Sequence, residues 1–396
     1  MEISNFGEIL ELQRGYDLPA SEMKEGKVPV AGSNGIIGYH DIAKVKAPCI
    51  TIGRSGSVGK VHFYNEDIWA HNTSLFVSNF KGNNEKYIYY LLKSKDFAKL
   101  CDSSVVPSLN RNFVYPMKTL FESNIKTQQK IAAVLSSLDD KIALNRRINA
   151  KLEAMAKRLY DYWFVQFDFP TEDGKPYKSS GGKMVYNATL KRDIPAGWEV
   201  TPLKKCINHI NTGLNPRDNF VLGNGKIKYV TVKNLTESGV IDFSNCDLID
   251  EEARAMVHNR SDIKIGDILF ASICPLGRCY LINEEPKDWD INESVFTIRP
   301  NYKNMSSQFL YSILRDEYYV KKMTQKATGS IFKGIRVDDL EKTEIILPSK
   351  EIVDLFTTKI TPILNQQAKL QQESTKLSEM RDKLLPLLMN GQIEVK

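Results

Sequence analysis

Apolar residues between Ile131 and Leu159 follow one another at spacings that alternate between four and three. Only two positions of this seam are polar, and the full set is Ile131, Leu135, Leu138, Ile142, Asn145, Asn149, Leu152, Ala156 and Leu159. Such spacing is typical of a helix that packs along a second helix. It predicts a helix over residues 126–165, about 60 Å long at 1.5 Å per residue.

A related pattern lies near the end of the sequence, over residues 350–396. Its apolar positions are Ile352, Phe356, Ile363, Leu370, Leu377, Met380 and Leu384. Pro362 predicts either a kink or a late start of this helix. We expect the two helices to pair antiparallel as a coiled coil. Because polar seam residues fix the register of such pairs, we expect Gln366 to meet Asn145 or Asn149. A spacer that sets a fixed distance and a plain packing role both remain open.

The stretches outside these helices are predicted to be mixed α/β. Short apolar runs bounded by Gly, Pro and Asn predict strands at residues 28–30, 49–52, 74–77, 267–270 and 295–298. Residues 85–100 and 306–323 have helical spacing. The predicted order is a first domain (head 1, residues 1–125), a central spacer helix (126–165), a linker (166–195), a second domain (head 2, residues 196–349) and a C-terminal spacer helix (350–396).

The second half of the chain repeats the order of the first. Gly277-Arg278 follows Gly59-Lys60 by 218 residues (277 − 59), and Asn292 follows Asn72 by 220 (292 − 72). Further matches are Ser330 with Ser108, Ile352 with Ile131, Phe356 with Leu135 and Ile363 with Ile142. A period this long predicts two similar domains related by a pseudo-twofold internal repeat, because solenoid repeats are about 20–50 residues long. Gly213 follows Gly15 by only 198 residues (213 − 15), so head 2 has about twenty extra residues before Gly277.

The composition is that of an ordinary folded protein of 396 residues. Lys and Arg number 54 against 48 Asp and Glu, a net charge of +6, and the mean hydropathy is −0.33. Residues 126–165 alone carry +4 (eight basic, four acidic), which fits either a solvated helix face or a stripe that faces phosphates. No apolar stretch approaches the roughly 20 residues that span a bilayer, so we expect a cytoplasmic protein without a membrane partner.

Sequence motifs for catalysis or metal binding do not emerge. The loop at residues 53–60 lacks the spacing of a P-loop and of a nucleophile elbow, and the five histidines show no HxxxH or HExxH spacing. The six cysteines form no CxxC pair, so free thiols are expected and no metal site is predicted.

Glycine-rich loops instead present polar and basic side chains that suit nucleic acid. Arg and Asn can pair with guanine and adenine edges, Ser with several bases, and Lys with phosphates. The candidate contacts in head 1 are Ser33, Asn34, Arg54, Ser55, Ser57, Lys60, Asn110, Arg111 and Asn112. Those in head 2 are Lys233, Asn234, Arg278, Ser330, Lys333 and Arg336. Simple surface turns have the same composition and are the alternative.

The layout resembles the specificity subunit of type I restriction-modification systems. The resemblance covers the whole chain and is carried by the head-plus-helix duplication and by residues 32–38 (GSNGIIG), 53–59 (GRSGSVG), 128–142 (QQKIAAVLSSLDDKI) and 160–164 (YDYWF). Residues 167–170, 181–183 and 194–198 are similar to the family's connection into the second head. Residues 128–142 are the most specific of these stretches.

The resemblance implies a non-enzymatic reader of double-stranded DNA. Each head would be a target recognition domain for one half of a split, asymmetric site, and the helices would set the gap and bind two modification subunits. Those subunits would use S-adenosylmethionine to methylate adenine, and restriction subunits that use ATP would join them. The chain itself would hold no cofactor. Two other classes remain open: a methyltransferase or nuclease with an unrecognised active site, and a coiled-coil scaffold without a DNA role.

Overall fold

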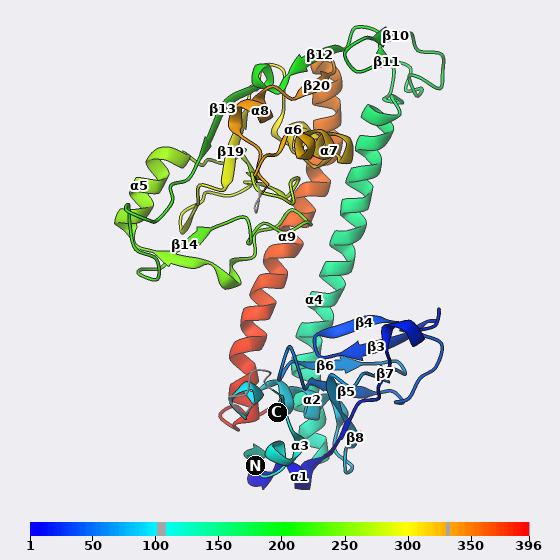
Figure 1. The fold of residues 1–396 in the computed structure, drawn as a ribbon, viewed down its shortest axis with the longest axis vertical. Coiled ribbons are helices and arrows are strands. Elements are labelled where there is room, and N and C mark those ends of the chain that lie inside the picture. Colours follow the sequence, from blue (N-terminus) through cyan, green and yellow to red (C-terminus); the bar gives the residue numbers. More distant parts are fainter. Residues whose placement is uncertain (101–107, 330–332, 396) are drawn as a thin grey trace. The chain divides into compact units, whose positions relative to one another are not determined.

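The computed structural model describes residues 1–100, 108–329 and 333–395. They form two compact units, Met1–Leu144 with Glu373–Lys396 (unit 1) and Asn145–Gln372 (unit 2). Head 1 belongs to unit 1 and head 2 to unit 2, and each long helix contributes one segment to each unit (Figure 1).

Two small sheets form the frame of head 1. An antiparallel sheet has the strand order β2-β8-β5-β6, and a second sheet has the order β4-β3-β7, in which β3 pairs antiparallel with β4 and parallel with β7. Strands β1 and β9 form a separate antiparallel pair. The strands are β1 (Glu2–Asn5), β2 (Glu11–Arg14), β3 (Val28–Gly32), β4 (Gly35–His40), β5 (Cys49–Gly53), β6 (Val61–Tyr64), β7 (Trp69–Ala70), β8 (Ser74–Asn79) and β9 (Lys118–Phe121).

Short helices complete head 1. Helix α2 (Glu85–Lys93) begins where the Asn84 side chain accepts a hydrogen bond from the backbone N–H of Tyr87, and its apolar face is buried in the core of the unit. The predicted helix over residues 85–100 is therefore wrong in length, because α2 ends at Lys93 and a separate 3₁₀ turn follows at Phe97–Leu100. The other helical pieces are α1 (Phe6–Ile9), η1 (Ala20–Glu22) and α3 (Arg111–Val114).

Head 2 has the same frame. Its four-stranded sheet has the order β13-β19-β16-β17, and its three-stranded sheet has the order β15-β14-β18, again with one antiparallel and one parallel pair. Two antiparallel pairs, β10 with β11 and β12 with β20, complete unit 2. The strands are β10 (Met184–Asn187), β11 (Arg192–Pro195), β12 (Glu199–Pro202), β13 (Ile207–Thr212), β14 (Ile227–Val230), β15 (Asp247–Ile249), β16 (Ile268–Ala271), β17 (Cys279–Leu281), β18 (Trp289–Ile291), β19 (Val295–Pro300) and β20 (Glu344–Leu347).

The helices of head 2 differ from the prediction at one point. Residues 306–323 form two helices, because Asp316 has an extended backbone and its side chain caps a new helix by accepting from the N–H groups of Tyr318 and Tyr319. The helices are α5 (Glu251–Ser261), α6 (Ser307–Arg315), α7 (Glu317–Lys326) and α8 (Val337–Glu341), with 3₁₀ turns at Leu203–Cys206 and Phe243–Asn245. Mixed α/β heads in two similar copies are thus confirmed.

The two long helices are α4 (Ile125–Tyr160), which continues into a π-helical turn at Asp161–Val165, and α9 (Lys350–Met389). Pro362 lies inside α9, so the predicted late start there is wrong. In unit 1, Arg381 of α9 donates to Asp139 of α4 at 2.7 Å, and Lys141 lies 3.5 Å from Glu373. In unit 2, the side chains of Asn149 and Gln367 each donate to the other's backbone carbonyl at 3.4 Å. In each unit, the segments of α4 and α9 therefore run antiparallel.

Burial along these helices locates the residues expected to pair. Leu135, Ile142, Asn145, Phe356 and Leu370 are buried, and the half-buried positions are Leu138, Asn149, Leu152, Leu159, Ile363, Leu377 and Leu384. Gln366 is exposed, so the expectation that it meets Asn149 is wrong by one residue: Gln367 occupies that place. Met380, also assigned to the seam, is 51% exposed. A repeat of seven drifts around a straight helix of 3.6 residues per turn, which explains both shifts.

The register of the internal repeat along the helices also needs correction. Buried Ile131 and Leu135 near the start of α4 correspond to buried Phe356 and Ile360 near the start of α9, an offset of 225 (356 − 131). The sequence matched Ile131 with Ile352 instead. That error is one helical turn, which leaves the same face of the helix apolar.

The segment predicted as a linker, residues 166–195, packs onto head 2. Phe167, Phe169 and Ile194 are buried in the core of unit 2 beside Trp198, and the Arg192 guanidinium lies 4.7 Å from the centre of the Phe167 ring. Among residues 1–100, 108–329 and 333–395, no helix has the length and apolar character to cross a lipid bilayer. Within the same ranges the cysteines are free thiols, and burial raises the pKa of Cys49 and of Cys206 to about 11.

Candidate nucleic-acid interface

Four loops of head 1 meet in one group, which we call loop cluster 1: residues 33–34, 53–60, 72–73 and 108. The Lys60 ammonium donates to the Asn34 side-chain oxygen at 2.7 Å, which joins the β5–β6 loop to the β3–β4 turn. Gly53 permits the close approach, because a Cβ there would lie 2.0 Å from the Ser57 carbonyl and 2.7 Å from the Ser33 carbonyl. Any larger residue at this position would push the loops apart.

Arg54 connects the other two loops to this group. Its backbone N–H donates to the Thr73 carbonyl at 2.8 Å, and its guanidinium donates to the Asn72 carbonyl at 3.4 Å. The Arg54 carbonyl accepts from the N–H of Leu109, and Ser55 forms an isolated bridge with Ser108. Backbone hydrogen bonds therefore hold the polar side chains of loop cluster 1 in place before any ligand arrives.

The electrostatics of loop cluster 1 are positive. Neither Arg54 nor Lys60 forms an ion pair with a carboxylate in the described part of the chain. Burial, followed by the nearby Lys60 charge, lowers the pKa of His62, so this ring is neutral at pH 7. Asn34 and Lys60 are exposed, and Ser33, Arg54, Ser55 and Ser57 are half-buried. The cluster can thus offer cations and neutral hydrogen-bonding groups to an anion.

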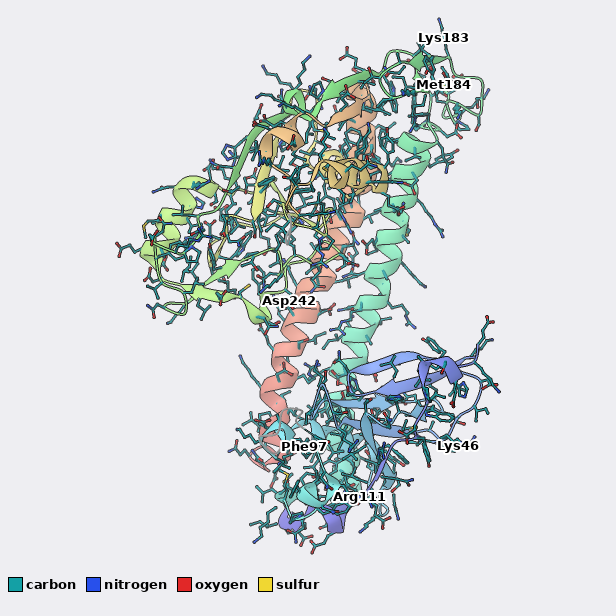
Figure 2. The ribbon with its side chains drawn as sticks, in the orientation of Figure 1. Lys46, Phe97, Arg111, Lys183, Met184 and Asp242 are labelled. Atoms are coloured by element: carbon teal, nitrogen blue, oxygen red, sulfur yellow. The ribbon has the colours of Figure 1, made fainter. Side chains whose placement is uncertain are left out.

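The candidates of head 1 that follow loop cluster 1 have local partners. The Asn110 side chain caps α3 by accepting from the N–H of Asn112 at 3.0 Å. The Arg111 guanidinium donates to the Leu12 carbonyl of β2 at 3.0 Å, and Figure 2 labels this side chain. All three residues are exposed, but the structure does not bring the Arg111 side chain into contact with Lys60 or Arg54.

Head 2 builds an equivalent group, loop cluster 2, from residues 231–237, 272–278, 292–294 and 333–336. The Ser272 N–H donates to the Ser294 carbonyl at 3.0 Å and the Ser272 carbonyl accepts from Ile335, as Arg54 does with Thr73 and Leu109. Ile273 bridges to Gly334 in the way that Ser55 bridges to Ser108. Gly334, rather than Ser330, is therefore the counterpart of Ser108. Ser330 lies outside the described residues.

Loop cluster 2, like loop cluster 1, contains several basic side chains. Lys233, Lys333 and Arg336 are exposed, and the Lys333 carbonyl accepts from the N–H of Cys274 at 2.8 Å. Arg278 is 29% exposed and lies 3.4 Å from a carboxylate oxygen of Glu237. Arg278 occupies the position that Lys60 has in head 1. The Arg278 carbonyl accepts a hydrogen bond from the Ala271 N–H, and the Lys60 carbonyl accepts the equivalent bond from the Gly53 N–H.

Asn234 differs from the other candidates because it is only 5% exposed. Its side-chain oxygen accepts from the N–H and the hydroxyl of Thr231 at 2.9 and 3.0 Å, and its amide nitrogen donates to the Asp242 carbonyl at 3.0 Å. These bonds use most of the hydrogen-bonding capacity of the amide. Asn234 therefore holds the turn that presents Lys233.

Sequence reasoning missed three members of these clusters. The repeat marks Asn72 and Asn292 but predicts no role for them, although the Asn72 carbonyl and the Asn292 side chain organise the loops. Glu237 was missed because no local pattern marks an acidic residue that folds back onto Arg278, 41 residues later. The repeat itself was the signal that could have pointed to Asn72 and Asn292.

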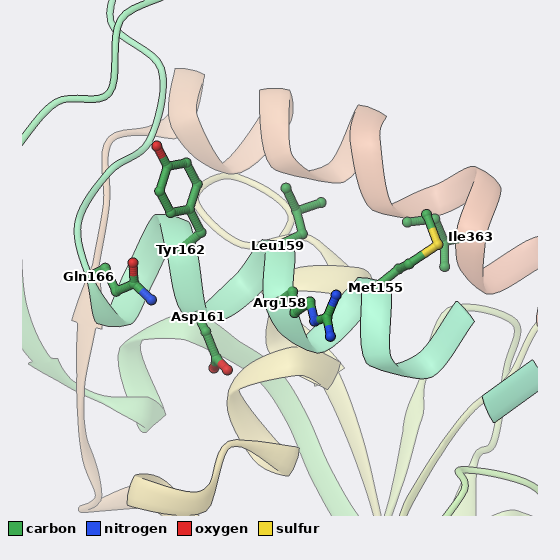
Figure 3. A pocket seen from close by; sticks show the side chains of 7 residues that line it. All are labelled: Met155, Arg158, Leu159, Asp161, Tyr162, Gln166 and Ile363. Carbon is green, nitrogen blue, oxygen red and sulfur yellow. The ribbon is translucent and has the colours of Figure 1, made fainter. Parts of the chain in front are cut away.

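The helices carry a second type of candidate surface. In unit 2, a shallow hollow of about 600 Å³ is lined by apolar Met155, Leu159, Tyr162 and Ile363, with Arg158, Asp161 and Gln166 beside them (Figure 3). Met155 is 54% exposed and Tyr162 is 40% exposed. We call this set of seven residues face A.

Face A has a counterpart in unit 1 at the repeat offset of 225. The equivalents of its apolar residues and of Arg158 are Met380, Leu384, Leu387, Leu138 and Lys383, which we call face B. The exposed fraction of Met380 is 51%, similar to the 54% of Met155. Lys383 is exposed, as is Arg158. Each face therefore combines an exposed methionine, apolar neighbours and a cation.

Comparison with known proteins gives consistent matches. A family model described as "Type I restriction modification DNA specificity domain" matches residues 1–154 and 195–378. The chain is 28% identical over 322 residues to the type I restriction enzyme MjaIX specificity subunit of Methanocaldococcus jannaschii, covering 78% of this chain and 69% of that protein. It is 26% identical over 318 residues to the HindI specificity subunit of Haemophilus influenzae, covering 68% and 67%.

A solved structure shares the fold. The type I restriction-modification S subunit from M. genitalium superposes with a TM-score of 0.60 at 16% identity, covering 98% of this chain and 96% of that one. The match extends over both heads and both long helices.

Proposed function

Because this chain belongs to the type I restriction modification DNA specificity family, we propose that it reads double-stranded DNA and catalyses no reaction itself. Head 1 and head 2 would each contact one half of a split, asymmetric site. One observation carries this proposal: the same frame presents a basic residue at the same place in each head, Lys60 and Arg278, among loops that otherwise differ. Equal frames suit two similar tasks, and unlike loops suit unlike half-sites.

Contacts to DNA would divide by chemistry. Lys60, Lys233 and Lys333 suit phosphates, whereas half-buried Arg54 and Ser55, held by backbone bonds, suit base edges or sugar. Further contacts are proposed for Ser57 and Arg336, which belong to the two clusters, and for the residues that follow loop cluster 1, Asn110, Arg111 and Asn112. Asn34 would act together with Lys60, to which it is bonded.

Faces A and B are proposed to receive two copies of a modification subunit. Two equivalent surfaces on one chain suit two copies of the same partner, and exposed methionine beside apolar side chains is a typical adaptable contact. Arg158 and Lys383 would meet acidic groups of the partner. S-adenosylmethionine would then bind to the modification subunits and ATP to restriction subunits. Helices α4 and α9, of 36 and 40 residues, would set the unread gap.

The test of DNA reading uses the chain assembled with its modification subunits. Methylation of a duplex library with a randomised region should select a motif of two parts separated by unread bases. Arg54→Ala should relax only one part and Arg336→Ala only the other, whereas Lys333→Ala should weaken binding without relaxing either part, because phosphate contacts carry no sequence information. A single continuous motif would contradict the division between heads.

An enzyme with an unrecognised site is the competing class. The purified chain alone, supplied with S-adenosylmethionine and duplex, should transfer no methyl group, whereas transfer would identify an enzyme. DNA affinity should fall steeply as salt rises, because phosphate contacts release counterions. A scaffold without a DNA role would bind no duplex at any salt concentration.

A further inference from the structure

The two heads hold their equivalent cations with different chemistry. In head 1, Lys60 donates to the neutral amide oxygen of Asn34 at 2.7 Å. In head 2, Arg278 pairs with the carboxylate of Glu237 at 3.4 Å. Asn34 and Glu237 come from equivalent connections, the one between β3 and β4 and the one between β14 and β15. The cation of head 2 is therefore partly neutralised, and that of head 1 is not.

The backbone of Glu237 is fixed while its side chain is free to turn. The Glu237 carbonyl accepts from the Arg315 guanidinium at 2.7 Å, and a turn closes beside it through Gly239 N–H and the Thr236 carbonyl at 3.2 Å. Gly239 fits this turn because its φ is +77° and because a Cβ would lie 2.1 Å from the Tyr311 hydroxyl. By contrast, the Glu237 side chain is 85% exposed. Release of Arg278 thus requires a side-chain rotation and no movement of the loop.

Arg278 has capacity for another partner. Its side chain is 29% exposed, and its contact with Glu237 uses one terminal nitrogen, whereas its Nε is buried and can be reached only if the side chain shifts. A guanidinium has five N–H donors, and phosphate oxygens match their geometry better than a single carboxylate contact at 3.4 Å. A phosphate that reached Arg278 would compete directly with the carboxylate.

We propose that Glu237 is an internal competitor for the DNA backbone: its carboxylate occupies Arg278 in free head 2, and a DNA phosphate displaces it on binding. This inference rests on the proposed function, since it requires Arg278 to face DNA. Glu237 then lowers the affinity of head 2 for any duplex, cognate or not, because the displaced pair has to be broken in both cases. Head 1 has no equivalent cost.

The expected size of the effect is modest. Exposed ion pairs alter equilibria by only a few-fold, so Glu237→Gln should raise the affinity for a non-cognate duplex about two- to five-fold. The measurement is a titration of labelled non-cognate duplex with the full chain in complex with its modification subunits, at fixed salt. Asp247→Asn is the matched control, because it removes the same charge from an exposed residue of β15 that forms no ion pair with Arg278 in the described part of the chain. It should change affinity by less than Glu237→Gln.

A double substitution separates pairing from general charge. In an Arg278→Gln background, Glu237→Gln should give no more than the Asp247→Asn effect, because the pair is already absent. Equal effects of Glu237→Gln with and without Arg278, or equal effects of Glu237→Gln and Asp247→Asn, would overturn the inference while the wild type still bound DNA. Failure of the wild type to bind any duplex would instead overturn the proposed function. Circular dichroism of each variant checks that it is folded.

Discussion

In head 1, strands β3 and β4 are joined by two residues, Ser33 and Asn34, whereas in head 2 the equivalent strands β14 and β15 are separated by residues 231–246. Helix α5 then follows β15, where head 1 has a short irregular stretch before β5. The longer β14–β15 connection and helix α5 account for the roughly twenty extra residues that the sequence comparison predicts before Gly277. Each three-stranded sheet retains a parallel pair between its central strand and one edge strand, so the duplication kept the frame and varied what the frame presents.

The insertion in head 2 brings its own support. Arg315 of α6 donates to the Tyr311 hydroxyl at 2.7 Å, as Lys93 of α2 does to the Tyr89 hydroxyl at 3.2 Å. Arg315 additionally donates to the Glu237 carbonyl and to Glu153 of α4. Head 1 contacts α4 through other residues. Gln128 of α4 donates a hydrogen bond to the Asn83 side chain, and the Tyr90 hydroxyl donates to Asp139 of α4. The longer loop of head 2 is thus accompanied by a cation that ties it to α4.

The strongest test of the shared frame uses Gly15 and Gly213. A Cβ at Gly15 would lie 2.1 Å from the His71 carbonyl, and one at Gly213 would lie 1.7 Å from the Ile291 carbonyl. Because backbone cannot yield like a side chain, each Gly→Ala variant should lose about 3 kcal/mol of stability in its own head. Hydrogen exchange of peptides from each head measures this separately.

Matched controls exist in both heads. Gly82 and Gly223 have positive φ values of +77° and +91° but open space around the Cβ position. Their replacement by Ala should cost only about 1 kcal/mol, from the backbone conformation alone. If Gly213→Ala lost about 3 kcal/mol while Gly15→Ala were as stable as Gly82→Ala, the two frames would not be equivalent.

The sequence predicted the frame better than the loops, for physical reasons. The seam of α4 is a local pattern, and none of its nine positions is exposed in the structure. The predicted alignment of α4 with α9 is wrong by one helical turn, because a shift of four residues keeps the same face of the helix apolar. The burial of a loop residue, by contrast, depends on parts of the chain that are not adjacent to it in sequence. Asn34 and Asn234 look alike in sequence, yet Asn234 is buried because the Asp242 carbonyl folds back onto it.

A second test asks whether faces A and B are equal. If faces A and B each receive one modification subunit, as proposed, Met155→Glu and Met380→Glu should each leave one of the two subunits bound, since a charge in an apolar contact costs about 3 kcal/mol, or roughly 100-fold in affinity. Native mass spectrometry counts the bound subunits. Ala154→Glu is the control, because Glu379 already occupies the equivalent position of α9. Loss of both subunits from either Met variant would mean that the faces do not act independently.

A third test compares the two cations directly. Lys60→Ala should reduce duplex affinity about tenfold and lower the salt slope by about one. Arg278→Ala should reduce affinity by less, about two- to three-fold, because the wild-type residue has first to leave Glu237. Fluorescence anisotropy over a series of salt concentrations measures both quantities. An equal or larger loss for Arg278→Ala would remove the predicted difference between the heads.

A smaller effect than the loss of Lys60 comes from giving head 1 the chemistry of head 2. Asn34→Asp places a carboxylate beside Lys60, whose ammonium now lies 2.7 Å from the Asn34 amide oxygen, while the two-residue turn is kept. A phosphate would then have to displace it, so duplex affinity should fall about two- to five-fold. In a Lys60→Ala background the same substitution should have a smaller effect, because no cation remains to be occupied. If Asn34→Asp weakened binding equally in both backgrounds, simple repulsion between the new charge and DNA would explain the loss, and the pairing of Lys60 would not matter.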